Sequence, residues 1–244
     1  MGLGAILVII TMVWIYRLTR LETVDCAEME LLYSDPAQVS SFDARSPNFG
    51  LRLRDYYVKT AYNACSPGKF ANGFVSLCAL NTVIKQGARC LDFAVYAVAG
   101  APIISTSAVD SFDVKETFNS VPFADAMETI SNTAFASGTC PCAKDPLFIH
   151  LRIMSDETSI YGQIANTIES KLGGRLVGPE YGYENHGKNI GLEKLCKFRG
   201  KVIIIADKSV NNLFTKTPLD ELVNIASGGV FMRSLRYTSG VKDT

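Results

Sequence analysis

The chain has 244 residues, 48% of them hydrophobic, which is enough for one domain of α/β barrel size with additional segments. Its 24 basic and 24 acidic side chains balance, so the overall charge gives no support to nucleic acid as a partner. The cysteines include no two Cys-x-x-Cys pairs of the kind that bind zinc.

The first predicted element is an uncharged apolar run over residues 1–16, which Arg17 and Arg20 follow. The run is shorter than the ~20 residues that span a bilayer, but it lengthens if the Arg17 side chain reaches up to the lipid headgroups. Trp14 and Tyr16 are typical of a membrane interface. A signal peptide would carry a basic first part and a small-residue cleavage site, and this segment has neither.

These features predict that residues 1–21 form an uncleaved single-pass membrane anchor. Because the arginines follow the apolar run, we expect the globular part on the cytosolic side of the membrane. Residues 22–56 show no periodicity and are rich in Ser, Asp, Pro and Arg. They predict a linker, or an arm that lies on a globular domain formed by residues 57–244.

The rest of the chain predicts both strands and helices, as an α/β fold requires. The apolar spacing of residues 74–85 predicts a helix. A second helix is expected to begin near Pro218 and to stop at Gly228-Gly229. Strands are predicted at 58–63, 89–96, 102–106, 146–152, 201–206 and 230–236.

The cysteines predict a mainly reduced environment. Cys78 and Cys90 lie in apolar runs and are expected to be small buried hydrophobic residues. Cys140 and Cys142 are too close in sequence for an ordinary loop disulfide. A pair between Cys65 and either of these two stays open.

The segments Gly87–Tyr96 and Pro102–Ser107, with their neighbours, resemble the X region of phosphatidylinositol-specific phospholipases C. The similarity covers about residues 55–208 and includes Val58–Asn63, Asp145–Arg152 and Leu195–Lys208. It implies a TIM-type (β/α) barrel of the PLC-like phosphodiesterase kind. A closed barrel of this type needs eight strands, so with about six we expect an incomplete or open barrel.

The resemblance also implies a site at five positions: Tyr62, Asn63, Asp92, Thr106 and Arg152. Family members carry catalytic histidines where this chain has Tyr62 and Thr106. A tyrosine with an ordinary pKa near ~10 is a poor base at neutral pH, and a threonine cannot shuttle a proton usefully. We therefore predict a relic pocket that has no catalytic residues.

No cofactor is expected either. Of the four positions that hold calcium ligands in the family, only Asn63 and Asp92 keep an oxygen ligand, and both are weak candidates for a metal site. Asp92 is expected to pair with Arg89 or Arg152 instead. By strand alternation, His150 is predicted to point away from the strand-end groups and to be structural. His186, in a glycine-rich loop, is expected to be structural or solvated.

These observations predict a catalytically inactive, membrane-anchored structural or binding protein. Similar PLC-like barrels, some of them degenerate, occur in large DNA viruses, so the resemblance implies a virion component, such as a minor capsid or internal-membrane protein with other assembly proteins as partners. Two alternatives stay open. One is an active phosphoric diester hydrolase with altered chemistry that uses Arg152 and Asp92, and the other is a phosphoinositide headgroup-binding module.

Overall fold

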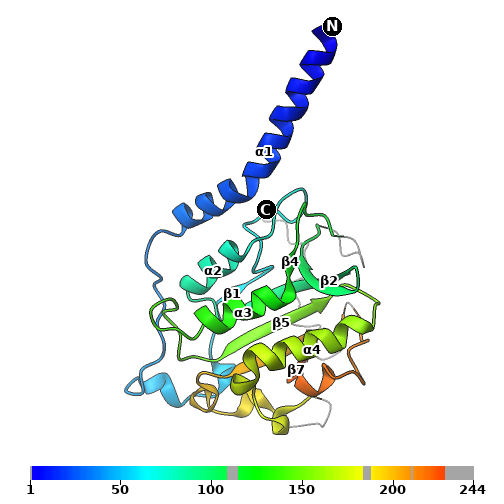
Figure 1. The fold of residues 1–244 in the computed structure, drawn as a ribbon. Coiled ribbons are helices and arrows are strands. Elements are labelled where there is room, and N and C mark those ends of the chain that lie inside the picture. Colours follow the sequence, from blue (N-terminus) through cyan, green and yellow to red (C-terminus); the bar gives the residue numbers. More distant parts are fainter. Residues whose placement is uncertain (1, 109–114, 184–187, 210, 229–244) are drawn as a thin grey trace, which may run out of the picture.

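A seven-stranded sheet forms the centre of the molecule (Figure 1). The computed structural model describes residues 2–108, 115–183, 188–209 and 211–228. The strand order is β4-β3-β2-β5-β6-β7, and β1 pairs in parallel with the start of β2. The pairs β2–β5, β5–β6 and β6–β7 are parallel, whereas β3 and β4 run antiparallel to their neighbours. The strands are β1 (Thr60–Ala61), β2 (Cys90–Val98), β3 (Ala101–Ser105), β4 (Val121–Pro122), β5 (Leu147–Ile153), β6 (Val202–Asp207) and β7 (Ile225–Ser227).

Three helices cover one face of this sheet, and a fourth extends from it (Figure 1). The α-helices are α1 (Gly2–Leu32), α2 (Leu77–Lys85), α3 (Phe123–Thr133) and α4 (Ser159–Leu172). Short 3₁₀ helices occupy several connections: Pro47–Gly50, Leu53–Asp55, Gly173–Arg175, Pro179–Tyr181, Ile190–Leu192, Leu195–Phe198 and Asp220–Leu222.

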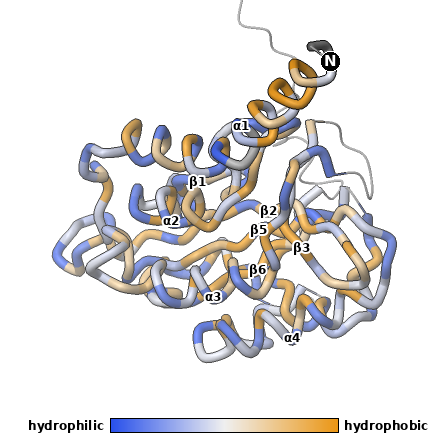
Figure 2. Tube along the Cα trace, turned by 45° about the horizontal axis from the view of Figure 1, so that its top comes forward, coloured by the Kyte–Doolittle hydropathy of each residue, from blue (hydrophilic) through white to orange (hydrophobic). Residues whose placement is uncertain are grey.

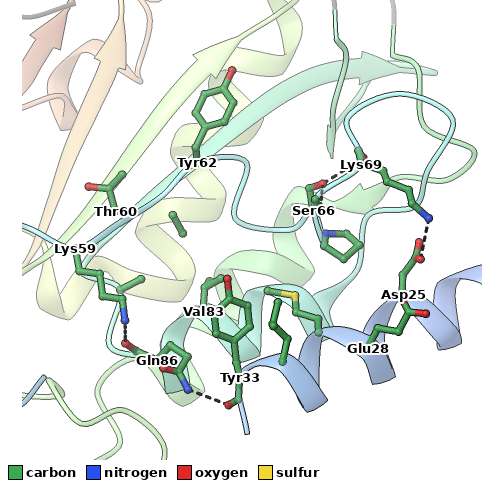
Figure 3. Close-up of a pocket in the computed structure, with 16 residues that line it drawn as sticks. Asp25, Glu28, Tyr33, Lys59, Thr60, Tyr62, Ser66, Lys69, Val83 and Gln86 are labelled. Carbon is green, nitrogen blue, oxygen red and sulfur yellow. Dashed lines mark hydrogen bonds and ion pairs between the residues drawn. The ribbon is translucent and has the colours of Figure 1, made fainter. Parts of the chain in front are cut away.

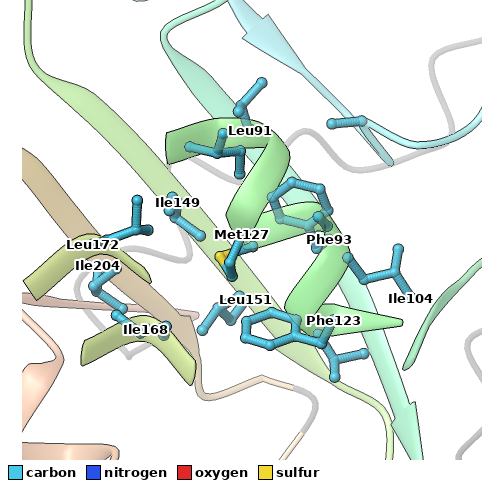
Figure 4. Packing of buried hydrophobic residues seen from close by; sticks show 14 of the residues in the cluster. Leu91, Phe93, Ile104, Phe123, Met127, Ile149, Leu151, Ile168, Leu172 and Ile204 are labelled. Atoms are coloured by element: carbon cyan, nitrogen blue, oxygen red, sulfur yellow. The ribbon is translucent and has the colours of Figure 1, made fainter. Parts of the chain in front are cut away.

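The main core lies between the sheet and the helices α2, α3 and α4, as Figure 4 shows. Alternate residues of β2 and β5 point to this side, because successive side chains in a strand face opposite ways. Phe93 and Leu151 are fully buried there, against Phe123 and Met127 of α3. The alternation therefore fixes which residues remain for the opposite face.

The opposite face of the sheet carries a smaller apolar cluster at one end and polar residues beside it. The apolar cluster consists of Leu53, Phe148, Tyr181, Ile190, Leu195, Phe198 and Ile203. Its members come from β5, from β6, from a short helix in the arm before β1 and from the short helices between α4 and β6. The remaining part of this face is free for a polar site.

The helix α2 and the turn after it bring β2 into place. Ser76 begins the helix, since its side chain accepts a hydrogen bond from the Ala79 backbone N–H. Gly87 then makes the turn into β2 with a φ of +79°. A Cβ on this glycine would come within 2.4 Å of Val39 Cγ2, so the backbone of the turn lies against the arm of residues 33–56.

The sequence predicted much of this architecture. The α/β class, the helix over 74–85 and five of the six strands are confirmed. The sheet does not close into a barrel within the described ranges. The predicted strand at 230–236 lies outside the described residues, and the last described strand is β7. Near Pro218 the chain forms only a 3₁₀ turn, and α4 was not predicted.

The N-terminal helix is longer than predicted, because α1 continues past residue 21 to Leu32. Its first part projects away from the body and is apolar and exposed (Figures 1 and 2). By length and composition, the helix over Gly4–Leu32 is long and apolar enough to cross a membrane. Its second part packs on the body beside α2, where Asp25 and Met29 are buried. Part of the predicted linker is therefore helix.

The prediction that Cys78 is a small buried hydrophobic residue is wrong, because its side chain is only partly buried and forms a disulfide. Cys26 and Cys78 form a disulfide with a Cα–Cα distance of 6.1 Å, within the range that disulfides span. Cys26 lies on the part of α1 that was expected to be a linker, so its position against α2 was not foreseen. Among the described residues Cys65, Cys140 and Cys142 are free, and the open alternative of a pair among them is not realised.

Candidate functional site

The candidate site is a polar cluster on the face of the sheet opposite the helices, and the buried carboxylate of Asp92 is its centre. Its Oδ1 accepts hydrogen bonds from Arg152 Nη2 at 2.7 Å and from the backbone N–H of Asn63 at 3.1 Å. Its Oδ2 lies 2.6 Å from His150 Nδ1 and accepts from Arg152 Nε at 3.0 Å. The carboxylate of Asp92, on β2, thus joins the segment that follows β1 to two residues of β5.

The strand register explains this meeting. In the parallel pair β2–β5, Asp92 lies beside His150 and Ala94 lies beside Arg152. His150 and Arg152 are two residues apart, so both side chains leave the same face of β5. The prediction that His150 points away from the site is therefore wrong. The His150 side chain does face away from its apolar neighbours in the core, and it therefore points toward Asp92 and the site.

Arg152 links the two residues that the resemblance implies as calcium ligands. Its Nη2 donates to Asn63 Oδ1 at 2.5 Å as well as to Asp92. Its guanidinium also lies over the ring of Tyr62, 4.6 Å from the ring centroid. The expected pair of Asp92 with an arginine is confirmed for Arg152. Arg89 instead donates to backbone carbonyls on the far side of the sheet.

The charges of this cluster stabilise each other. Burial alone would raise the pKa of Asp92, but the hydrogen bonds from His150 and Arg152 outweigh it and hold that pKa below the usual range. Burial alone would lower the pKa of Arg152, but the hydrogen bond to Asp92 and the attraction of its negative charge together outweigh burial and raise that pKa. The pair is therefore ionised over the whole neutral range.

Two of the five predicted site residues lie at the margin. Tyr62 is 56% exposed, and its ring meets the edge of Phe70 at a centroid distance of 5.7 Å. Thr106 is buried, and its hydroxyl donates to the Phe70 carbonyl at 2.9 Å. Its hydroxyl is therefore engaged with the backbone. The structure gathers Asn63, Asp92 and Arg152 into one cluster, and it places Tyr62 over Arg152 at the margin and Thr106 beside it.

Two further members of the cluster were missed by the sequence prediction. His150 Nε2 lies 2.7 Å from Ser227 Oγ, while its other ring nitrogen faces Asp92. Ser227 ends β7, which is separated from β5 in the sheet by β6. The position of His150, two residues before Arg152, was the available signal for the histidine. Nothing comparable marks Ser227. His186 lies outside the described residues.

A separate hollow of about 420 Å³ lies between the second part of α1 and the start of the sheet (Figure 3). Tyr62 borders it, with its ring turned away from α1. Lys69 Nζ pairs with Asp25 Oδ1 at 3.3 Å, and Lys59 Nζ donates to the Gln86 carbonyl at 2.6 Å. Both lysines therefore already bind protein oxygens at this hollow.

Comparison with known proteins gives matches in structure only. No family model and no curated protein matches the chain. The crystal structure of PLC21 from L. pealei is similar with a TM-score of 0.59 and 18% identity, over 75% of this chain and 25% of that one. PLC21 from S. officinalis gives 0.58 and 17%, again over 75% and 25%. A calcium-dependent phosphoinositol-specific phospholipase C from Pseudomonas sp. gives 0.49 and 12%, over 75% and 68%.

The chain spans about a quarter of the length of the two PLC21 proteins. At this level of identity the similarity concerns the fold, and it supports a PLC-like phosphodiesterase fold for this chain. The PLC-like fold that the sequence resemblance implied is supported in this coarser form, whereas closure of the sheet into a TIM-type barrel is not seen in the described residues. The degenerate site and the viral setting stay predictions.

Proposed function

We propose that this chain is a membrane-anchored binding or structural protein that keeps a PLC-like phosphodiesterase fold and no longer cleaves inositol phosphodiesters. One observation carries the proposal: the guanidinium of Arg152 binds both Asn63 Oδ1 and Asp92 Oδ1. These are the two oxygens left from the implied calcium set, so an internal cation occupies the place of the metal.

Calcium would have little to gain here. It prefers six to eight oxygen ligands, and both remaining oxygens are already in charge-assisted hydrogen bonds. A calcium ion would have to displace Arg152 and leave its charge unpaired in a largely buried position. The two positions implied for catalytic histidines hold Tyr62, which is exposed, and Thr106, whose hydroxyl is already bonded.

A turnover assay and a calcium titration test this proposal. The full chain in detergent, incubated with phosphatidylinositol vesicles with and without calcium, should release no inositol phosphate above a blank. Calorimetry should give no micromolar calcium isotherm. Calcium-dependent release that disappears in Asp92→Asn would overturn the proposal.

A second candidate function, a phosphodiesterase with altered chemistry, is favoured by His150. This histidine brings an acid–base group into a cluster that also holds a fixed positive charge, Arg152, on the same carboxylate. The same assay separates the two functions. Release without calcium, lost in His150→Gln and kept in Tyr62→Phe, would favour the enzyme.

Membrane attachment through α1 is part of the proposal. The apolar side chains of its first part are exposed, with Ile9, Met12 and Trp14 each at least 60% exposed. Deleting residues 1–21 should move the protein from the membrane pellet to the soluble fraction with little change in melting temperature, because the packed part of α1 and Cys26 remain. A full-length chain that is soluble without detergent would contradict this.

Two features of the chain favour opposite orientations in the membrane. Arg17 and Arg20 favour a cytosolic body, whereas the disulfide of Cys26 and Cys78 is typical of an oxidising compartment. Protease protection of sealed vesicles decides between the two sides. A virion setting, assembly partners and headgroup binding stay predictions. At the hollow of Figure 3, Lys59 and Lys69 already bind protein oxygens, so these two lysines give no support to headgroup binding.

A further inference from the structure

Three side chains on the site face of the sheet are arranged in a line. Asp92 Oδ2 lies 2.6 Å from His150 Nδ1, and His150 Nε2 lies 2.7 Å from Ser227 Oγ. We propose that Ser227 is a nucleophile activated by His150, with Asp92 as the positioning residue, and that it reacts with carboxylic esters that have an apolar acyl group. This activity goes beyond the proposed function and does not depend on it.

The hydrogen bonds define the role of each atom. A carboxylate only accepts, so the proton of the neutral imidazole is on Nδ1 and the lone pair of Nε2 faces Ser227. The Ser227 hydroxyl can then donate to Nε2, which is the arrangement that a serine nucleophile requires. The same order of groups recurs on unrelated folds and is recognised by its geometry.

The surroundings of Asp92 hold this arrangement in place. Arg152 Nη2 and the Asn63 N–H bind Oδ1, so the carboxylate cannot rotate away from His150. The pKa of Asp92 is held low against the effect of burial by the hydrogen bonds from His150 and Arg152. A carboxylate that stays ionised can stabilise the imidazolium that forms when His150 takes a proton.

A groove beside the three residues suits an acyl chain. Ser227 is half-buried and the His150 side chain is 20% exposed, so a small molecule can reach both. Phe148 lies two residues before His150 on β5, and Ile225 lies two residues before Ser227 on β7, so each shares the strand face of that residue. Together with Ile190 they line an open groove of about 740 Å³. Pockets of this size that bind small molecules are mostly apolar, with a few polar groups at one end.

The proposed reaction has two steps. Ser227 Oγ attacks the ester carbonyl carbon and gives its proton to His150 Nε2. The bond from that carbon to the alkoxy oxygen then breaks, and the proton passes from His150 to the leaving oxygen, which departs as an alcohol. Water next attacks the acyl-Ser227 carbon with His150 as its base. The acid is released and Ser227 regains its proton.

An alkyl fluorophosphonate is the probe for this nucleophile, because it loses fluoride when an activated serine attacks its phosphorus. The full chain in detergent should gain one adduct by intact mass, and peptide mapping should locate it on Ser227. Ser227→Ala should abolish labelling, and His150→Gln should slow it by about 10²–10⁴-fold. Asp92→Asn should slow labelling and change its pH profile, which a merely structural carboxylate would leave unaltered.

Ser209→Ala is the matched control. Ser209 lies close to the residue after Ser227, since a Cβ built on Gly228 would meet Ser209 Cβ at 2.7 Å. The Ser209→Ala variant should be labelled at the wild-type rate. Wild type and Ser209→Ala should both hydrolyse short p-nitrophenyl esters. If Ser227→Ala does not fold, the mapped adduct on the wild-type chain still decides. No adduct, or an adduct on another residue, overturns the proposal.

Discussion

The two faces of strands β2 and β5 carry alternate residues of the same segments, and they differ in how their contacts are made. On the helix side, Phe93 and Leu151 are fully buried among apolar neighbours from three helices. On the opposite side, Asp92, His150 and Arg152 each depend on two or three specific partners. The first face tolerates exchange between similar residues, whereas the second changes its chemistry with a single substitution.

The energetics of the two faces differ in the same way. Burying a large apolar side chain contributes about 1.5–3 kcal/mol, and the helix side buries many of them. A buried ion pair has a net contribution close to zero, because desolvation offsets the attraction, but it is costly to break from one side. The helix side can therefore maintain a PLC-like fold while the opposite side loses or gains a function.

The largest effect is expected on the helix side. Phe93→Ala should lower the free energy of unfolding by about 3–5 kcal/mol, because it leaves a cavity in the middle of the main core. Ile205→Ala, on the partly exposed opposite side of β6, is the matched control and should cost clearly less. Chemical denaturation of both variants measures the difference. Equal losses would contradict the distinction between the faces.

The second effect tests the ion pair. Arg152→Met should cost about 3 kcal/mol, since it leaves the buried charge of Asp92 with one partner fewer. The double variant Asp92→Asn with Arg152→Met should lose less than the sum of the two single variants. Urea unfolding of the four proteins gives the coupling. Additive losses would mean that the two side chains contribute to stability independently. That result would contradict the coupling expected from the 2.7 Å contact between Arg152 Nη2 and Asp92 Oδ1.

The third effect is a pH dependence. The pKa of Asp92 is lower in the folded protein than in the unfolded chain, where it is about 3.9. The group therefore contributes stability above pH 4, and this contribution is lost as pH falls through its folded pKa. The gap in stability between wild type and Asp92→Asn should thus narrow as the pH falls below about 4. If the difference in stability between wild type and Asp92→Asn widened in acid, folding would raise the pKa of Asp92 and the prediction would be wrong.

The sequence predicted the helix side better than the site. Short apolar runs located β2, β3, β5 and β6, because a strand that is buried in a sheet leaves a run of apolar residues in the chain. Asn63, Asp92 and Arg152 were reached in a different way, through the resemblance to the phospholipase C X region, and all three belong to predicted strands. The prediction for His150 was wrong because it compared this residue only with its apolar neighbours on β5. Arg152 lies two residues later and therefore shares the face of His150.

Two contacts could not have been predicted from local pattern. The disulfide of Cys26 and Cys78 depends on α1 continuing as a helix along α2, and neither cysteine has a spacing that indicates a partner. The contact of His150 with Ser227 depends on the order of strands β5, β6 and β7 in the sheet. Both join segments that are far apart in the chain, so only the assembled fold determines them.

The smallest expected effect is at the margin of the site, where Tyr62 covers Arg152. Its ring lies 4.6 Å from the guanidinium but is 56% exposed, so the contact should contribute only about 0.5–1 kcal/mol. Tyr62→Ala should lose that amount in urea unfolding, and Tyr62→Phe should lose almost nothing, because the ring carries the contact and the hydroxyl does not. Tyr62→Phe should also leave fluorophosphonate labelling of Ser227 unchanged. A loss above about 2 kcal/mol for Tyr62→Ala, or slower labelling in Tyr62→Phe, would place the phenol inside the polar network, and the boundary between the exposed margin and the site would then have to move outward.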